Sequence, residues 1–288
     1  MALTKDKVSM IEQDIERLQK GMHHDPFQVL GWHPDGKNWL VREWLPTAES
    51  AMIEGKIPLT RIEGTDLFVA QLSASEKKAL PQHYQVHWTE SDGSQHQVAS
   101  PYSFMPFVGE LDKYLFLEGR HWQIYNLMGA HYKTIDDVVG VQFAVWAPAA
   151  SRISVVGDFN GWHGLRHPMR TTGNGIWELF IPGLHPGDIY KYEIRNHHTG
   201  DILVKTDPYA QAMEVRPHTG SLVYHSEHDW LDGDWMSARE KYDWMTSPIS
   251  VYEVHLGSWH RSDDGQFLNY RDIAHRLVEY VKWMGFTH

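Results

Sequence analysis

Short segments in which apolar and polar residues alternate recur along most of the chain, and they limit the possible folds more than any other feature. Such segments cover residues 68–72, 84–88, 143–146 and 177–181, with residues that favour turns between them. Alternation with a period of two places successive side chains on opposite faces of a β-strand. Short strands at intervals of about ten residues are typical of antiparallel β-sandwiches, so we expect a mainly β chain.

The chain also resembles itself. The matching pairs are residues 30–33 with 128–131, 44–48 with 146–150, 84–86 with 190–192, and 101–102 with 208–209. The offset grows steadily along the chain, as expected when loops gain residues while strands keep their order. We therefore predict two tandem immunoglobulin-like β-sandwiches, one over residues 22–112 and one over residues 113–225.

The two ends of the chain have a different pattern. Apolar residues at helical spacing (Val8, Ile11, Ile15 and Leu18) predict a helix within residues 1–21. Residues 226–247 are polar and indicate a linker. A predicted strand over residues 249–256 precedes a predicted helix that starts near Tyr270 and ends at Gly285. Parallel strands need neighbours on both sides, so residues 226–288 are expected to hold a linker and the start of an incomplete domain.

Composition excludes several classes of protein. A net charge of −11 argues against nucleic acid or an anionic membrane as a partner. The chain has no Cys, and no apolar stretch long enough to span a membrane. No metal-binding or nucleotide-binding motif occurs, so we expect no metal and no other cofactor. These features predict a soluble, cytoplasmic protein. The 13 Trp residues, some of them in loops, suggest an uncharged ligand with flat C–H faces, such as a sugar.

One loop is a candidate for binding such a ligand. Residues 157–162 (Gly-Asp-Phe-Asn-Gly-Trp) follow an apolar strand and end in Trp162. Trp162 could offer a platform to a sugar ring, with Asp158 and Asn160 as hydrogen-bonding neighbours. Alternatively, the turn only packs its aromatic side chains into the sandwich. Lys191 lies between two Tyr residues on a predicted strand, so it is expected to point away from them, either towards a ligand or simply into solvent.

Glu253 and His255 share one face of the predicted strand over residues 249–256. If this strand lines a barrel, both side chains enter the barrel near its C-terminal rim, where active sites of such barrels lie. Alternatively, they form a hydrogen-bonded structural pair. No pair of carboxylates lies on neighbouring strand ends, so we predict no catalytic residues within the chain.

Several longer stretches resemble the bacterial 1,4-α-glucan (glycogen) branching enzymes of the α-amylase superfamily. They are residues 25–33, 127–131, 143–148, 155–162, 205–210, 251–259 and 282–288. The resemblance implies an N-terminal sandwich, a glycogen-binding sandwich and the first unit of a (β/α)8 barrel. It implies a retaining reaction that cleaves an α-1,4 bond and transfers the chain to a 6-hydroxyl. The catalytic carboxylates would come from later barrel strands, so residues 1–288 alone would be inactive.

The second predicted sandwich is also similar to the glycogen-binding module of AMP-activated kinase β subunits, in which two Trp and a Lys grip the glucan. Trp162 and Lys191 match one Trp and the Lys, whereas residues 199–202 replace the second Trp. The implied partners are α-1,4 glucan (amylose or glycogen) and the rest of the chain's own barrel, without a cofactor. The alternative is a non-catalytic glucan-binding protein that targets a partner to glycogen. A third possibility is a debranching or trehalose-forming relative, and the linkage of the reaction product would distinguish it from a branching enzyme.

Overall fold

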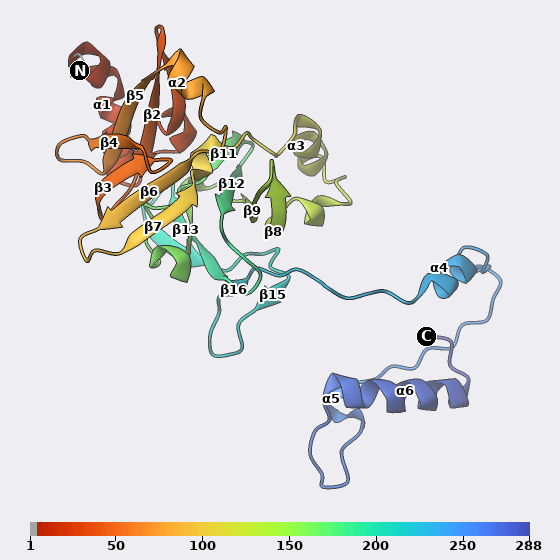
Figure 1. The fold of residues 1–288 in the computed structure, drawn as a ribbon. Helices are drawn as coiled ribbons and strands as arrows, with labels where there is room; N and C mark the ends of the chain where they lie inside the picture. Colours follow the sequence, from red (N-terminus) through yellow and green to blue (C-terminus); the bar gives the residue numbers. More distant parts are fainter. Residues whose placement is uncertain (1–4) are drawn as a thin grey trace. The chain divides into compact units, whose positions relative to one another are not determined.

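The computed structural model describes residues 5–288 and divides into two compact units (Figure 1), one ending at Ser226 and the other comprising Glu227–His288. The predicted N-terminal helix is confirmed as α1 (Lys5–Gln19), although the side chains of Val8 and Ile11 lie outside the described part. Ile15 and Leu18 are buried in a cluster that includes Leu40 of the neighbouring sheet. The first unit contains two β-modules.

The N-terminal module is one antiparallel sheet with the strand order β1-β2-β5-β4-β3-β6-β7. Strand β4 pairs with both β5 and β3, and a single core receives side chains from β2 through β6. The sheet therefore folds back on itself through β4, where we expected two separate sheets. Its elements are β1 (Gly31–Asp35), β2 (Asn38–Trp44), β3 (Ala48–Ile53), β4 (Ile57–Arg61), β5 (Leu67–Ser73), α2 (Ala74–Lys78), β6 (Gln85–Glu90) and β7 (Gln95–Ala99).

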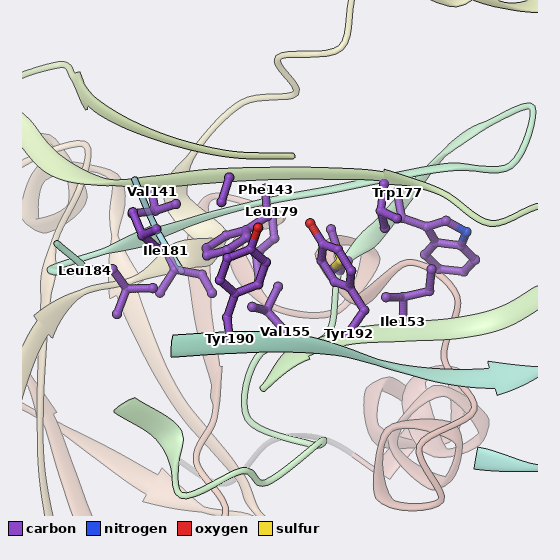
Figure 2. Close-up of a cluster of buried hydrophobic side chains, with 14 residues drawn as sticks. Val141, Phe143, Ile153, Val155, Trp177, Leu179, Ile181, Leu184, Tyr190 and Tyr192 are labelled. Atoms are coloured by element: carbon purple, nitrogen blue, oxygen red, sulfur yellow. The ribbon is translucent and has the colours of Figure 1, made fainter. Parts of the chain in front are cut away.

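The second module has two antiparallel sheets that enclose one core. Figure 2 shows Phe143 and Leu179 of one sheet facing Val155, Tyr190 and Tyr192 of the other. The first sheet has the order β11-β12-β9-β8, with β8 (Gly129–Ile135), β9 (Val138–Trp146), β11 (Arg170–Gly173) and β12 (Ile176–Pro182). The second has the order β10-β13-β16-β15 with β14 beside β13, and comprises β10 (Ala150–Gly157), β13 (Ile189–Asn196), β14 (Ile202–Lys205), β15 (Ala212–Met213) and β16 (Ser221–Leu222).

The two modules make equivalent contacts at equivalent positions of the repeat. His33 Nε2 donates to the carbonyl of Leu30 at 3.0 Å, and His131 Nε2 donates to that of Met128 at 2.9 Å. Gly31 and Gly129 both have a positive φ, and each passes close to the backbone of the Tyr that follows the repeated Pro. The short sequence matches therefore correspond to matching local structures.

Helix α3 (Glu110–Leu117) runs across the boundary predicted at residues 112 and 113. Just before this helix, the chain is held by the second module: Glu178 accepts hydrogen bonds from the backbone N–H groups of Phe107 and Val108. Arg170 pairs with Glu178 and also donates to the carbonyl of Phe104. These buried polar contacts tie the connection between the modules to the sheet of the second module.

The C-terminal unit contains α4 (Gly233–Arg239), α5 (Leu256–Trp259) and α6 (Tyr270–Met284). The predicted helix is confirmed as α6, which ends where Gly285 adopts a φ of 79°. The predicted strand over residues 249–256 is wrong, because residues 250–255 form no regular strand and α5 begins at Leu256. A strand needs a hydrogen-bonded neighbour along its whole length, and here backbone pairing is confined to Ser250 and Tyr252.

That limited pairing nevertheless has a parallel pattern. Tyr252 N donates to His288 O at 2.8 Å, and His288 N donates to Ser250 O at 2.9 Å. The two segments lie on either side of α6 in the sequence, as in a β-α-β connection. In the part of the chain that the structure describes, every helix is too short or too polar to cross a membrane.

Candidate functional site

The loop over residues 157–162 is a tight turn that leaves β10 and presents Trp162. Gly157 ends the strand, and the backbone N–H of Trp162 donates to the Gly157 carbonyl at 2.9 Å. Trp162 has a φ of 57°, in the left-handed region that a bulky side chain rarely adopts. Such strained residues persist where the surrounding structure holds them, and they cluster at functional sites.

Asp158 fixes the orientation of the Trp162 ring. The indole Nε1 donates to Asp158 Oδ1 at 2.7 Å, and 40% of the Trp162 surface remains exposed. The indole is thus partly exposed while its polar edge is already bound within the protein. This arrangement suits stacking against an apolar ligand face, with Asp158 as a positioning residue.

Asn160 has a different environment from the one expected of a ligand-binding residue. It is buried, its Nδ2 donates to Val155 O at 2.9 Å, and its Oδ1 accepts from Gly157 N at 3.1 Å. Its Nδ2 also lies 2.8 Å from Nδ1 of His167. Burial lowers the pKa of His167 to about 3, so this ring stays neutral and can accept a hydrogen bond from Asn160. Asn160 therefore holds the turn together.

Lys191 lies on β13 opposite Val156, the residue just before the turn. Its neighbours Tyr190 and Tyr192 point into the core (Figure 2), so Lys191 faces the other side of the sheet. The Lys191 ammonium donates to Thr219 Oγ1 at 2.8 Å. Thr219 was not identified from the sequence, because it lies 28 residues away in a segment without a recognisable pattern.

Strand β14, which begins at the end of the turn over residues 199–202, carries exposed apolar side chains. This turn stands where the related glycogen-binding module has its second Trp. Ile202 and Val204 of β14 pair with Arg195 and Glu193, which places both on the same face of the sheet as Lys191. About half of each side chain is exposed (52% and 51%). This face therefore offers aliphatic surface beside Lys191 but no aromatic ring from β14.

The two barrel-rim candidates lie in the C-terminal unit, and both are exposed. His255 Nδ1 hydrogen-bonds to Ser258 Oγ at 2.8 Å, and His255 precedes α5. Glu253 lies in the extended segment before it, so the two are not on a regular strand. Among the side chains that the structure describes (residues 12–288), no group of three or more His, Asp or Glu could hold a metal ion.

A buried carboxylate lies next to the strand that carries Lys191. Asp207 accepts hydrogen bonds from Tyr190 Oη at 2.6 Å and from Tyr192 Oη at 3.1 Å. Burial raises the pKa of Asp207. Because these contacts fix the two Tyr residues that flank Lys191, Asp207 stabilises the part of β13 that carries Lys191. Asp207 directly precedes the repeated Pro-Tyr pair at residues 208–209, so its position could have been singled out.

Two families match separate parts of the chain. Residues 127–210 match carbohydrate-binding module 48 (isoamylase N-terminal domain). This stretch of the chain contains Trp162 and Lys191. Residues 11–102 match the N-terminal domain of the alpha-1,4-glucan branching enzyme GlgB. The two matches coincide with the two β-modules of the first unit.

Relatives similar over nearly the whole chain are named 1,4-alpha-glucan branching enzyme GlgB. The protein of Hydrogenovibrio crunogenus is 63% identical over 97% of this chain, and that of Cellvibrio japonicus is 51% identical over 96%. The protein of Methylococcus capsulatus is 47% identical over 96% of this chain. The chain spans 39%, 39% and 38% of the lengths of these relatives, respectively. This chain corresponds to the N-terminal portion of the GlgB family of 1,4-alpha-glucan branching enzymes.

Proposed function

We propose that this chain is the glucan-holding N-terminal portion of a 1,4-α-glucan branching enzyme of glycogen biosynthesis. The observation that carries the proposal is the 63% identity to a protein of that name over 97% of the chain. The whole protein would cleave an α-1,4 glucan and transfer the released chain to a 6-hydroxyl by a retaining double displacement. Its catalytic carboxylates would lie outside residues 1–288, so this chain alone would be inactive.

The proposed organisation is two tandem immunoglobulin-like modules followed by the start of a (β/α)8 barrel. The equivalent contacts of His33 and His131 support the duplication. The parallel hydrogen bonds of Ser250 and Tyr252 with His288, on either side of α6, support a β-α-β start. In a completed barrel, Glu253 and His255 would lie near its rim.

In the second module, a glucan chain would lie across the Trp162 ring. The C–H face of a sugar packs on an aromatic face, and Asp158 holds that ring in place. The Lys191 ammonium, already hydrogen-bonded to the Thr219 hydroxyl, would donate to a sugar hydroxyl. No metal or organic cofactor is required for this role.

Migration through native gels that contain glycogen tests the glucan-binding part of the proposal. Trp162→Ala removes the platform. It should weaken the affinity for glycogen, measured from the retardation, by about tenfold, which is the scale of a lost aromatic anchor. Asp158→Ala should weaken it less, because the ring remains but is no longer oriented. Trp122→Ala is the matched control, since Trp122 is 89% exposed and lies outside the turn. Parent-like migration of Trp162→Ala would contradict the platform role.

The amylose–iodine absorbance tests where catalysis lies. The purified chain should leave this absorbance unchanged, because the proposed reaction needs two carboxylates held close together on other strands. A sustained loss of absorbance with pure chain would contradict the assignment of catalysis to another part of the protein.

A further inference from the structure

A groove whose lining includes neither Trp162 nor Lys191 lies where the two modules of the first unit meet. It has a volume of about 490 Å³ and is lined by α2 and residues 80–82, by Trp32 of β1, by residues 102–105 and by Arg170 of the second module. Small-molecule sites typically have volumes of this size and combine apolar walls with a few polar groups. The groove belongs entirely to the first unit.

The apolar walls of the groove are aromatic. Phe27 packs edge-on against Tyr102 with ring centroids 5.2 Å apart, and Arg170 stacks on Phe27 at 4.0 Å. Trp32 packs edge-on against the buried Tyr84 at 4.9 Å and is half-buried. These rings are held by the protein, so a ligand would meet a wall that is already in place.

The polar groups that are free in the groove are all donors or amides. The Lys77 ammonium lies over two indole rings, 4.1 Å from the Trp39 centroid and 5.4 Å from that of Trp32. Lys78 and Gln82 are exposed beside it. Among the described residues that line the groove there is no carboxylate, and Lys77 and Lys78 have no ion-pair partner. The groove therefore presents N–H donors next to aromatic surface.

We propose that this groove is a second binding site for a linear α-1,4 glucan, separate from the Trp162 face. Such a chain offers C–H faces to the aromatic wall and hydroxyl oxygens to Lys77, Lys78 and Gln82. The identity of the ligand rests on the proposed function, whereas the existence of the groove does not. A second site would hold another part of the same polymer, and two linked sites bind a polymer far more tightly than one.

The absence of Cys from the chain allows a reporter confined to the groove. Met105 lines the groove and is 75% exposed, so Met105→Cys can carry an environment-sensitive fluorophore. Lys56→Cys, in the exposed turn between β3 and β4, is the matched control label. Titration with maltoheptaose should give a saturable signal from the first label only. Because the ligand is neutral, the apparent affinity should change little with salt.

Lys77→Met in the labelled protein keeps the apolar stem over the Trp rings and removes the donor. It should weaken maltoheptaose binding at the groove by about three- to tenfold, the scale of one lost hydrogen bond. Lys37→Met, in the exposed turn between β1 and β2, should have no effect. If Lys77→Met lowers the melting temperature, Gln82→Ala takes its place, because Gln82 is exposed.

The outcomes separate this proposal from the first one. The groove signal should persist in the Trp162→Ala background, since the sites are distinct. Absence of a saturable groove signal, with glycogen retardation through Trp162 intact, would overturn the second site alone. Loss of glycogen retardation and of the groove signal in the parent would overturn both proposals. A response to glucose 1-phosphate without a response to maltoheptaose would overturn the neutral-glucan assignment.

Discussion

At the scale of single residues, the carboxylate of Glu178 holds the connection between the two modules. It is fully buried, pairs with Arg170 Nε at 2.6 Å, and accepts from the N–H groups of Phe107 and Val108. Glu178→Gln leaves the buried guanidinium without its counter-charge and should lower the free energy of unfolding by about 3–5 kcal/mol. Urea denaturation measures this change. The exposed Glu49→Gln should stay within about 0.5 kcal/mol of the parent, and an equally small effect of Glu178→Gln would contradict the argument.

Glu43 should make stability depend on pH. It is buried and accepts hydrogen bonds from Tyr84 Oη and Ser100 Oγ, and burial raises its pKa from 4.5 to about 7. The folded state therefore binds the proton more tightly than the unfolded state. This contribution is fully present below pH 4.5 and is lost as the pH rises through about 7.

The parent should therefore lose about 3 kcal/mol of stability relative to Glu43→Gln between pH 4.5 and 8. Paired urea titrations at several pH values measure the difference, and other titrating groups cancel because both proteins contain them. Parallel pH profiles for the two proteins would contradict the argument, because they would show that folding leaves the pKa of Glu43 unchanged.

Sequence reasoning located individual residues unevenly. Trp162 was predicted on a loop, and its exposure agrees with one of the two alternatives considered. Asn160 has the polar side chain expected of a ligand contact, yet it is buried and bonded within its own turn. Residue type alone does not distinguish a polar group facing solvent from one that closes a turn. The contact of Lys191 with Thr219 depends on tertiary structure, so no local pattern could have indicated it.

At the scale of elements, the glycines that open β1 and β8 are required by close backbone approach. A Cβ at Gly31 would lie 2.5 Å from Tyr102 O, and one at Gly129 would lie 3.0 Å from Tyr209 O. Gly31→Ala should lower the free energy of unfolding by about 3 kcal/mol or more, because strain from positive φ adds to the clash. Gly129→Ala should cost less.

The matched control for these two variants is Gly36→Ala. Gly36 also has a positive φ, but a Cβ there would meet no atom within 4 Å. Gly36→Ala should therefore lower the free energy of unfolding only by the strain of a positive φ, about 1 kcal/mol. Thermal unfolding of the three variants measures the order of the effects. Equal losses for Gly31→Ala and Gly36→Ala would show that the close approach to Tyr102 is unimportant.

Elements with a complete local signal were predicted well. Helix α6 has apolar residues at helical spacing, a capping Asn269 and a terminal Gly285, all of which are local features. The segment over residues 249–256 also has a strong local β pattern, but a strand forms only where another strand pairs with it. Here two residues have such pairing, and the remainder stays extended or turns into α5. Local preference was thus outweighed by the lack of neighbours.

At the scale of the whole molecule, the chain should be cut near the start of its second unit. Residues 227–232 are largely exposed and lack secondary structure, and Trp230 and Leu231 are 74% and 92% exposed. Chymotrypsin should cleave first after one of these two residues, since cleavage needs locally open backbone. Intact mass spectrometry identifies the products. The double variant Trp230→Gly and Leu231→Gly should slow this first cut, and equal rates would contradict its position.

The organisation of the whole molecule was partly predictable. Alternation predicted the antiparallel β-modules because each strand carries its own pattern of inward and outward residues. The way the N-terminal sheet folds back through β4 was missed, since β4 pairs with β3 and β5 at once and pairing partners are not encoded locally. The boundary predicted at residues 112 and 113 stays a prediction, and α3 spans these residues.

The buried contacts between the modules have an evolutionary consequence. A recombination breakpoint between Val108 and Gly109 would place Arg170 and Glu178 on one side, and the Phe104 carbonyl and the two N–H groups that they bind on the other. A breakpoint after Ser226 would leave all of these contacts intact. Genetic exchange should therefore transmit the two modules as one inherited block.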